Sequence, residues 1–472
     1  MGCGCSEDRN TGSEVDPKPS TPNAQPPFSN SKPLPSSSEF VGVNISSQTS
    51  ISRCQLSVRY SLISKYKVGK LKHAQLAELK STKRRCVIFS QAKTSSTETE
   101  LLEKRLKLDH PHLRRILECL QDSDWLHVVH EECAGGELSN MLETGQHFVE
   151  LQVAMIAKQT LEVMSYLHQR NYWHGQLRPE FVAFKECSQN LVIVKISGLV
   201  APSVQTLSPY HAPEAVPGLG SAQADIWTCG VIIYRLLIGE LPFQIHSDVR
   251  PVSIPSSISP EAAAFLRPMF LMDPVHRPTA ETCLSHPWLR RVPKDFTPVD
   301  LLKKVEDIEN SQLTGSLRVA IFRFMIDQVV EPAKVSKASR FFTALDLDHD
   351  GLLNKEEITA GLRFVMKEAK AQEVTARLMA VLDRNHSTQV DFSEFLVAAL
   401  ETKALLSDSA LLKAFNALDE EKQGWLTNDH LRKVFYVESQ AAWAAVLADV
   451  HVPSDGKITF DLFRAFMHNV SQ

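Results

Sequence analysis

Hydrophobic residues are distributed unevenly along the chain. Residues 6–49 are rich in Ser, Pro, Asn and Thr and hold few large apolar side chains. Such a composition cannot bury a core, so this stretch is expected to be a flexible tether. Apolar periodicity begins past Ser57. The pattern predicts a tether over 1–56, a globular domain over 57–289, a joining helix over 290–333 and two helical pairs over 334–402 and 403–472.

Helical periodicity dominates the second half of the chain. Four helix–loop–helix periods follow one another at intervals of roughly 35 residues. Within the joining segment, residues 316–325 place apolar side chains on one face of a helix and Arg on another. Such a helix can lie in the groove that a pair of helix–loop–helix units opens. A plain connecting helix is the alternative.

Composition limits the class of protein. The chain has 472 residues, enough for about three domains, and its 43% hydrophobic and 22% charged residues are ordinary for a globular protein. The net charge of −4 and the lack of a basic stripe argue against nucleic acid as a partner. No apolar run approaches the roughly 18 residues that span a bilayer, and the N-terminus lacks the apolar core of a secretory signal. The nine scattered Cys favour reduced thiols in the cytoplasm.

The strongest ligand pattern is in residues 346–357, which read D-L-D-H-D-G-L-L-N-K-E-E. Acids at positions one, three and five, Gly at six and Glu at twelve make an oxygen cage for Ca²⁺, completed by the carbonyl at position seven. An acidic turn without a metal would not need Gly351 and Glu357 in register. The predicted metal ligands are Asp346, Asp348, Asp350, Leu352 and Glu357.

A second loop, residues 383–394, matches the same pattern less well. Position six is Thr388, and a β-branched residue strains the sharp turn that Gly allows. The loop also offers fewer carboxylates, so the sequence leaves open whether it binds Ca²⁺ at useful concentrations. Its candidate ligands are Asp383, Asn385, Ser387, Gln389 and Glu394.

Two further loops lack key ligands. Residues 419–430 keep Gly424 but end in His430, and residues 451–462 carry Pro453 at position three. Their flanking helices are expected to pack as a pair without metal, although a partner-binding groove is the alternative for their apolar stripe. That stripe comprises Leu411, Leu412, Phe415, Leu418, Phe460, Phe463, Phe466 and Met467.

Residues 174–181 read H-G-Q-L-R-P-E-F, which resembles H-R-D-L-K-P-E-N, the catalytic loop of a protein kinase. Gln176 replaces the Asp that accepts the substrate proton, and Phe181 replaces the Asn that holds Mg²⁺. An amide has no usable basicity and a phenyl ring cannot ligate a metal. The loop therefore predicts a kinase frame without its chemistry.

Positions that contact nucleotide in a kinase are altered as well. Residues 68–74 keep only Gly69 of G-x-G-x-x-G, a weak remnant of a nucleotide loop. The segment C-V-I-F resembles V-A-I-K with an apolar residue, assigned to Ile88, in place of Lys. Ser197 lies where the metal-binding Asp of D-F-G belongs. Glu100, the candidate helix glutamate, is therefore without its usual Lys partner.

Positions that hold a kinase fold together are retained. Glu214, in H-A-P-E, is expected to pair with Arg277, and Asp225 begins a D-x-W-S-x-G-like helix start. Loss of a general base alone costs about 10²–10⁴ in rate. We therefore expect the kinase-like domain to be inactive in phosphoryl transfer, which also places binding of ATP and Mg²⁺ in doubt.

The first six residues, M-G-C-G-C-S, fit the N-myristoylation pattern, with Gly2 as the acyl acceptor. One myristoyl chain binds membranes only marginally, and palmitate on Cys3 and Cys5 could supply a second anchor. The expected location is cytoplasmic and peripheral to a membrane surface. An unmodified start with two incidental thiols is the alternative.

An acylatable N-terminus, a kinase-like domain, a junction helix and four EF-hand-like repeats occur here in that order. The chain resembles the calcium-dependent protein kinases of plants and protists over roughly residues 57–470. The resemblance implies an α+β bilobal kinase-like domain followed by an all-α calmodulin-like EF-hand domain. It also implies that Ca²⁺, held by the ligands of residues 346–357, draws the junction helix into the EF-hand lobes.

Two functions follow from these expectations. In the first, the chain is a pseudokinase and membrane-tethered Ca²⁺ sensor that recruits an unidentified protein partner. In the second, it is a weakly active Ca²⁺-regulated Ser/Thr kinase with a relocated base, for which Asp109 is a candidate. A calcium buffer fits poorly with a single good site. Stabilisation by nucleotide and Mg²⁺ favours the second function, and a Ca²⁺-dependent shape change without it favours the first.

Overall fold

A computed structural model describes most of the chain from Ile51 to His468. The residues it does not describe are 1–50, 54, 67–73, 82, 93–105, 189–191, 199–207, 216–219, 244–251, 291–297, 310–315, 329, 331, 364, 384–386, 401–404, 420–421, 429, 432–455 and 469–472. The predicted acylation residues Gly2, Cys3 and Cys5 lie outside the described residues, as do Gly69, Glu100, Asn385 and Pro453.

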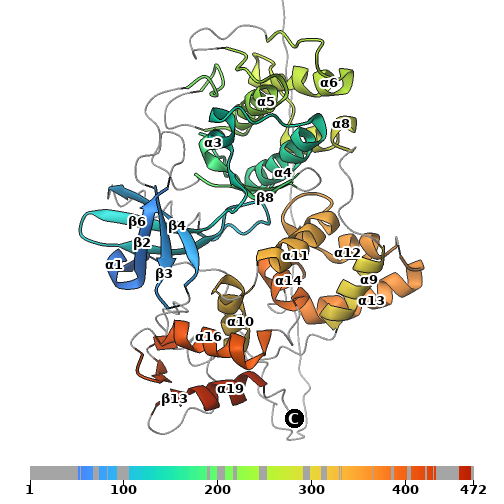
Figure 1. Cartoon of the computed structure of the whole chain (residues 1–472). Helices are drawn as coiled ribbons and strands as arrows, with labels where there is room; N and C mark the ends of the chain where they lie inside the picture. The colour runs from blue at the N-terminus through green and yellow to red at the C-terminus, as the bar shows by residue number, and fades with distance from the viewer. Residues whose placement is uncertain are drawn as a thin grey trace, which may run out of the picture. The chain divides into compact units, whose positions relative to one another are not determined.

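The first part of the kinase-like half is a six-stranded sheet (Figure 1). One strand, β1, pairs in parallel with β5, and the other neighbours are antiparallel. Residues 51–53 lie within the tether predicted over residues 1–56, but as β1 they pair with β5 and belong to this sheet. In sheet order the strands are β1 (Ile51–Arg53), β5 (Ile116–Gln121), β6 (Trp125–Glu131), β4 (Arg85–Ala92), β3 (Ala74–Leu79) and β2 (Tyr60–Lys65), and the helix α1 (Leu56–Arg59) precedes β2.

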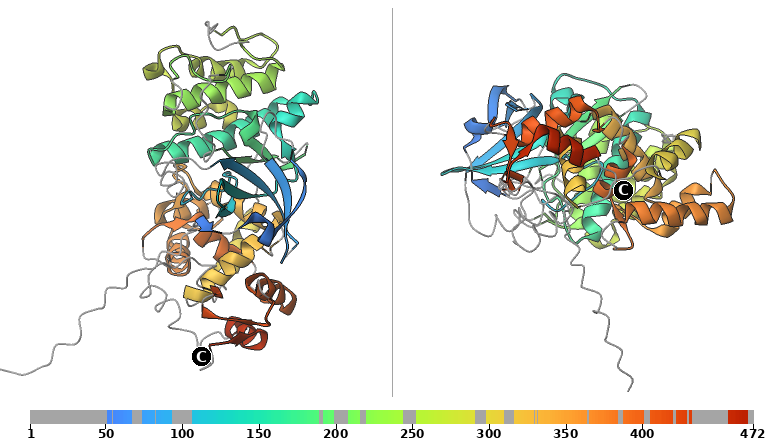
Figure 2. Two further views of the ribbon diagram at one scale, coloured as in Figure 1. Left: turned by 90° about the vertical axis from the view of Figure 1, so that its left-hand side faces the viewer. Right: turned by 90° about the horizontal axis from the view of Figure 1, so that it is seen from below.

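The second part of this half is mostly helical. Two long helices, α4 (Glu150–Gln169) and α5 (Ala222–Ile238), lie side by side in Figures 1 and 2. Ser221 begins α5 by accepting a 3.1 Å hydrogen bond from Ala224 N, and Gly239, at φ +93°, ends it. The remaining elements are β7 (Gly136–Glu137), α3 (Leu138–Glu143), η1 (Pro179–Phe181), β8 (Val182–Cys187), β9 (Val192–Ile196), α6 (Pro260–Met269), η3 (Pro274–His276), α7 (Ala280–Leu284) and α8 (Pro287–Arg290).

Apolar side chains of α4 and α5 form the centre of this helical part. Trp227 of α5 is fully buried, with its ring 5.8 Å from Phe243 and 5.4 Å from Phe270. Trp288 of α8 packs 4.9 Å from Phe265. Aromatic side chains bury large areas, so these clusters fix α5, α6 and α8 against one another. The helix α5, which contacts residues 174–181 (the catalytic-loop segment) through Asp225, is thereby fixed in this core.

The rest of the described chain is helical, with short strand pairs. Two-residue strands join loops: β10 pairs with β11 and β12 with β13, both antiparallel. One apolar cluster runs through all these helices, centred on Phe322, Phe342 and Phe395. The elements are α9 (Pro298–Glu309), α10 (Ser316–Gln328), α11 (Pro332–Leu345), β10 (Leu352–Leu353), α12 (Lys355–Leu362), α13 (Glu368–Leu382), β11 (Val390–Asp391), α14 (Phe392–Ala399), α16 (Asp408–Leu418), β12 (Trp425–Leu426), β13 (Ile458–Thr459) and α19 (Phe460–His468).

The last two helices pack through their aromatic residues. Phe415 of α16 lies 5.5 Å from Phe460 and 5.6 Å from Phe463 of α19. Leu412, which the sequence assigned to the same stripe, is 45% exposed, because it lies on the outer face of α16. Within the described residues, no helix is both long and apolar enough to cross a bilayer.

Candidate functional site

The catalytic-loop segment is held in place by hydrogen bonds to Asp225 of α5. Its carboxylate accepts 2.8 Å hydrogen bonds from the backbone N–H groups of His174 and Gly175 and lies 3.0 Å from His168 Nε2. Asp225 is 1% exposed, and three partners satisfy its buried charge. The structural role predicted for Asp225 is therefore the role its contacts describe. The loop keeps a defined shape even though its reactive groups have changed.

The two altered residues of this loop both meet Gly198. Gln176 donates a 3.2 Å hydrogen bond from Nε2 to the Gly198 carbonyl. The ring of Phe181 packs so closely that a Cβ added at Gly198 would lie 2.4 Å from Phe181 Cδ1. Ser197 is buried and donates from its backbone N–H to the Phe181 carbonyl at 2.8 Å. At these positions an amide, a phenyl ring and a hydroxyl replace the groups that would bind metal or accept a proton.

Glu214 and Arg277 form the predicted ion pair. The guanidinium makes a bidentate contact, with NH1 2.6 Å and NH2 3.1 Å from the two carboxylate oxygens. Arg277 also donates to the Leu271 and Gln223 carbonyls and lies 5.0 Å over the Trp227 ring. This geometry is the strong form of an arginine–carboxylate contact. It ties the segment before α5 to the turn after α6.

The strand β4 presents apolar residues on both faces. Ile88 is fully buried in a cluster with Tyr60 and Leu120 on one face of the sheet. Its neighbour Phe89 points to the opposite face, 5.3 Å from the His130 ring and 5.7 Å below the Arg114 guanidinium. Whichever of the two residues matches the nucleotide-binding Lys of a kinase, the position carries no cation.

Buried cations close to this region are already paired. Lys185 and Lys195 both contact Glu131, at 2.7 and 3.0 Å, and their charges hold the pKa of Glu131 well below its usual range despite burial. Arg114, fully buried, donates at 2.9 Å to Glu137, which is itself buried. The sequence motifs did not reveal these pairs, because the partners lie far apart in the chain.

Asp109 lies away from the catalytic-loop segment. Its carboxylate accepts a hydrogen bond from Ser393 Oγ of α14 and lies 3.9 Å from Arg323 of α10. Its backbone N–H donates to Tyr166 Oη at 2.8 Å. The contacts thus place Asp109 against the helical half rather than beside Gln176, so it is a poor candidate for a relocated base.

The loop at residues 346–357 brings three carboxylates together. Asp346, Asp348 and Asp350 offer oxygen atoms that all lie within 4.8 Å of one another. Hydrogen bonds within the loop hold this arrangement: Gly351 N donates to Asp346 at 3.1 Å, and Leu352 N to Asp350 at 2.7 Å. Gly351 adopts φ +75°, the left-handed conformation that the sharp turn requires.

Without a bound cation, the ionised carboxylates of this loop are unfavourable, because they are partly buried and repel one another. Burial, followed by the nearby Glu357 and Asp350 charges, raises the pKa of Asp346 to about 8. Asp346 Oδ1 is buried and has no hydrogen-bond donor among the described residues. Glu357 Oε1 accepts from the backbone N–H groups of Leu347 and Asp348 at 2.8 and 3.3 Å. A hard cation with oxygen preference, such as Ca²⁺, fits this cluster.

The loop at residues 383–394 keeps its turn under strain. Thr388 adopts φ +68°, a conformation that a β-branched residue rarely takes. Asp383 holds the turn by accepting 2.9 and 3.0 Å hydrogen bonds from the backbone N–H groups of Ser387 and Thr388. The Ser387 hydroxyl donates to the Gln389 carbonyl at 2.6 Å. Burial, then the Asp391 charge, raises the pKa of Glu394 to about 7.

The third loop is shaped without a terminal carboxylate. Asp419 accepts from the backbone N–H groups of Gln423 and Gly424 at 3.0 and 2.7 Å. His430 takes the capping position of Glu, with its Nδ1 accepting from Thr427 N at 3.4 Å. Among the described residues of this loop, Asp419 forms the turn and His430 stands in place of the terminal carboxylate.

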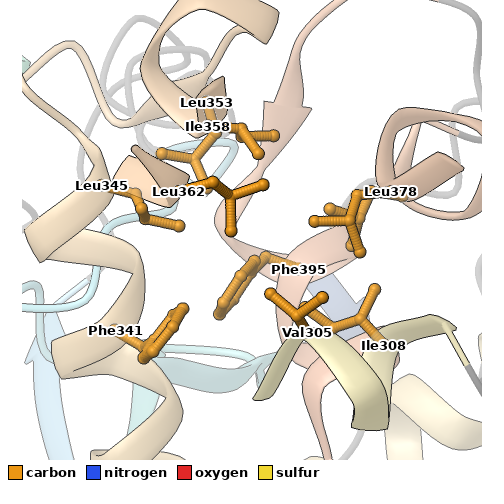
Figure 3. A pocket seen from close by; sticks show the side chains of 10 residues that line it. Val305, Ile308, Phe341, Leu345, Leu353, Ile358, Leu362, Leu378 and Phe395 are labelled. Carbon is orange, nitrogen blue, oxygen red and sulfur yellow. The ribbon is translucent and has the colours of Figure 1, made fainter. Parts of the chain in front are cut away.

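Two helices of the joining segment pack into the helical half. In α10, Phe322 and Met325 are fully buried, and the Arg318 guanidinium lies 5.1 Å over the Phe466 ring. Figure 3 shows that α9, which the sequence did not single out, directs Val305 and Ile308 into the apolar groove of α11–α14. The cavity that remains there measures ≈ 10 Å³, so α9 fills the groove.

The chain is similar to known proteins in both halves. Residues 64–289 match the protein kinase domain family. This part of the chain is kinase-like. Calcium-dependent protein kinase 4 of Plasmodium berghei is 27% identical over 406 residues, covering 78% of this chain and 76% of that protein. Calcium-dependent protein kinase 7 of Arabidopsis thaliana is 28% identical over 399 residues, covering 78% and 73%.

These likenesses extend well past the kinase-like part, because 78% of the chain is a larger share than residues 64–289 occupy. Among solved structures, the Rad53 kinase domain with SCD2 is 26% identical, with a TM-score of 0.44, covering 52% of this chain and 93% of that chain. A calcium-dependent protein kinase-like chain was the sequence expectation, and the comparisons support it at this level.

Proposed function

We propose that this chain is a Ca²⁺ sensor of the calcium-dependent protein kinase type whose kinase-like domain has become a binding module. The observation that carries the proposal is the pair of contacts at Gly198, made by the Gln176 amide and the Phe181 ring. A kinase needs a base and a metal ligand at these two positions. The Gln176 amide is not a base and the Phe181 ring offers no atom to bind Mg²⁺, so the segment serves as packing.

The calcium half of the proposal rests on the loop at residues 346–357. Three converging carboxylates, a left-handed Gly351 and the terminal Glu357 make the donor set of an EF-hand. When Ca²⁺ binds, it supplies the charge that offsets the repulsion among these acids. The names of the relatives, all calcium-dependent protein kinases, support the same ion.

A direct experiment measures phosphoryl transfer from labelled ATP by the purified full-length chain, onto itself and a generic Ser/Thr substrate, with and without Ca²⁺. The Asp346→Ala, Glu357→Ala double variant runs beside it. We expect no transfer in any condition. Ca²⁺-stimulated transfer that the double variant loses would overturn the inactive assignment and establish the alternative, a weakly active Ca²⁺-regulated Ser/Thr kinase, which the names of the relatives favour.

Nucleotide binding needs its own measurement, because an inactive domain can still hold ATP. We expect no rise in melting temperature when ATP and Mg²⁺ are added, since Phe181 and Ser197 stand where a kinase carries its two metal ligands. Binding of one ligand raises stability by RT ln(1 + [L]/Kd), about 2.7 kcal/mol at a hundredfold excess over Kd. A shift of several degrees that requires Mg²⁺ would contradict the expectation.

The membrane tether is the last element of the proposal. The N-terminal pattern supports myristoylation at Gly2 and palmitoylation at Cys3 and Cys5. We expect the cellular protein to sediment with membranes and to become soluble in a Gly2→Ala variant. A Cys3→Ser, Cys5→Ser variant should bind only weakly, because a single myristoyl chain anchors marginally. Membrane association that survives Gly2→Ala would exclude this anchor.

A further inference from the structure

The first calcium loop contacts the kinase-like half through a small surface at the end of α4. This docking patch consists of Tyr166, Gln169 and Arg170. Gln169 Nε2 donates a 3.0 Å hydrogen bond to the Asp348 carbonyl, and Arg170 NH1 donates to the Asp350 carbonyl. Both acceptors are backbone atoms of the calcium loop.

The cation of the docking patch is held in place by its own helix. The Arg170 guanidinium lies 4.1 Å over the Tyr166 ring and donates to the Tyr166 carbonyl at 3.4 Å. A cation–π contact and two carbonyl acceptors restrict a side chain that is otherwise long and mobile. Arg170 is therefore a positioned charge beside the acidic loop rather than a free surface cation.

The turn of the calcium loop fits the patch closely. A Cβ added at Gly351 would lie 2.3 Å from Tyr166 Cδ2, so the ring packs directly against the glycine backbone. A glycine is thus required at position 351 for two reasons: the backbone φ is +75°, and the Tyr166 ring leaves no room for a Cβ atom.

A second contact steadies the same interface. Asp109 accepts a hydrogen bond from Ser393, the second residue of α14 and part of the second loop, and lies 3.9 Å from Arg323 of α10. Tyr166 Oη accepts from Asp109 N at 2.8 Å, which joins this contact to the docking patch. Both loops of the first helical pair and the joining helix therefore meet one region of the kinase-like half.

The patch leaves the metal ligands free. In a loop of this type the ion binds the side chains at positions one, three and five and the carbonyl at position seven, which is Leu352. The docked carbonyls belong to positions three and five, so Arg170 and Gln169 take no ligand atom. What the patch adds is one fixed positive charge next to a cluster of carboxylates.

We propose that docking of this loop and Ca²⁺ binding oppose each other, with Arg170 acting as a resident cation that Ca²⁺ displaces. This inference rests on the proposed Ca²⁺ sensor. Ca²⁺ brings two positive charges to the carboxylates that Arg170 faces, and like charges repel in this partly buried site. By thermodynamic linkage, the factor by which docking lowers the affinity for Ca²⁺ equals the factor by which bound Ca²⁺ lowers the equilibrium constant for docking.

Docking could instead favour Ca²⁺ by holding the loop in shape, but the loop already holds itself. Gly351 N and Leu352 N donate to Asp346 and Asp350 within the loop. Glu357, in contrast, must leave the Leu347 and Asp348 N–H groups to reach an ion. That movement shifts α12, which pulls the tight turn away from Tyr166. Charge and geometry therefore act in the same direction.

The test measures Ca²⁺ affinity of the full-length chain by calorimetry, in a Glu394→Ala background so that the first loop reports alone. The Arg170→Met variant keeps the aliphatic stem and removes the charge, and we expect it to bind Ca²⁺ about 5-fold or more tightly, the lower end of common coupling strengths. Gln169→Ala removes one docking hydrogen bond without a charge and should give a smaller gain. Arg267→Met, an exposed cation on α6, is the matched control.

A second readout follows the undocking itself. Amide hydrogen exchange of a peptide covering residues 160–172 should become faster when Ca²⁺ is added to the wild-type chain, because the docked loop leaves the end of α4. Equal Ca²⁺ affinity in Arg170→Met and Arg267→Met, or exchange that Ca²⁺ slows or leaves unchanged, would overturn the coupling.

Failure of the sensor itself is distinguishable from failure of the coupling. If the Asp346→Ala, Glu357→Ala variant binds Ca²⁺ as the parent does, the first loop is not a calcium site, and the proposed sensor falls together with this inference. If that variant loses binding while Arg170→Met leaves affinity unchanged, the sensor stands and only the coupling is wrong.

Discussion

Two buried histidines of the kinase-like half should make the folded chain sensitive to mild acid. His112 is 4% exposed and His130 is 5% exposed, and burial lowers the pKa of each to about 3. Although Glu162 lies 3.6 Å from His112 Nε2, burial dominates, so the neutral imidazole is the folded form. Nearby Arg114 lowers the pKa of His130 further.

The direction of the pH effect on stability follows from comparing proton binding in the folded and unfolded states. A histidine in the unfolded chain has a pKa of about 6.5, so below that pH the unfolded state binds a proton that the folded state does not. The stability from each histidine is complete above the unfolded pKa and is lost as pH falls toward the folded value. At pH 5 the loss is about 2 kcal/mol per histidine, at about 1.4 kcal/mol per pH unit.

The assay is urea unfolding of His112→Gln and its parent between pH 7.5 and 5. Unfolding is monitored by tryptophan fluorescence, because most of the six Trp lie in the kinase-like half. Every variant carries Asp346→Asn, because the pKa of Asp346 is raised to about 8 and its titration would add a slope of opposite sign. His147→Gln, at an exposed position, is the control.

We expect His112→Gln to lose about 2 kcal/mol less stability than its parent over this range, whatever its stability at pH 7.5. The control should keep the parental slope. A His112→Gln variant with the same pH slope as its parent would refute the reasoning, since it would mean that His112 binds protons equally in both states.

Three further predictions concern packing and strain. Glu214→Ala leaves Arg277 buried without its carboxylate and should lower the free energy of unfolding by about 3 kcal/mol, seen in chemical denaturation; a loss below about 1 kcal/mol would contradict the ion pair. Phe322→Ala empties a fully buried site on α10 and should lower stability by about 3–5 kcal/mol, whereas an unchanged melting temperature would show that α10 does not pack there. Thr388→Gly relieves a left-handed β-branched residue and should stabilise the second loop by about 1 kcal/mol; destabilisation would mean that the Thr side chain contributes more than its strain costs.

Much of the candidate site could be predicted from local sequence motifs. Asp346 to Glu357 form a spacing rule within twelve consecutive residues, so the sequence could predict their convergence without knowing the fold. The same holds for Gln176 and Phe181, whose neighbours identify the loop even though the reactive groups are gone. Glu214 and Arg277 are distant in sequence, yet Glu214 belongs to the short motif H-A-P-E, and the bidentate contact of the two residues agrees with the predicted pairing.

Contacts between segments without a motif could not be predicted. β1 joins the sheet through parallel pairing with β5, and three residues of strand leave no clear periodicity. α9 fills the groove of α11–α14, although the sequence directed attention to α10 as the groove helix. Asp109 was named as a candidate for a relocated base, but its side chain contacts Ser393 and Arg323 instead.

The Phe181 ring against Gly198 makes the change in the catalytic-loop segment hard to reverse by single steps. A carboxylate introduced by Gln176→Asp would face the Gly198 carbonyl that the Gln176 amide now donates to, so a hydrogen bond would become a repulsion. With Phe181 in place of a metal ligand, the segment would not hold a Mg²⁺ ion to neutralise the new charge. Each reversion alone would therefore be unfavourable, and several would have to occur together. The packing around the altered loop therefore disfavours each of the residues that catalysis would require.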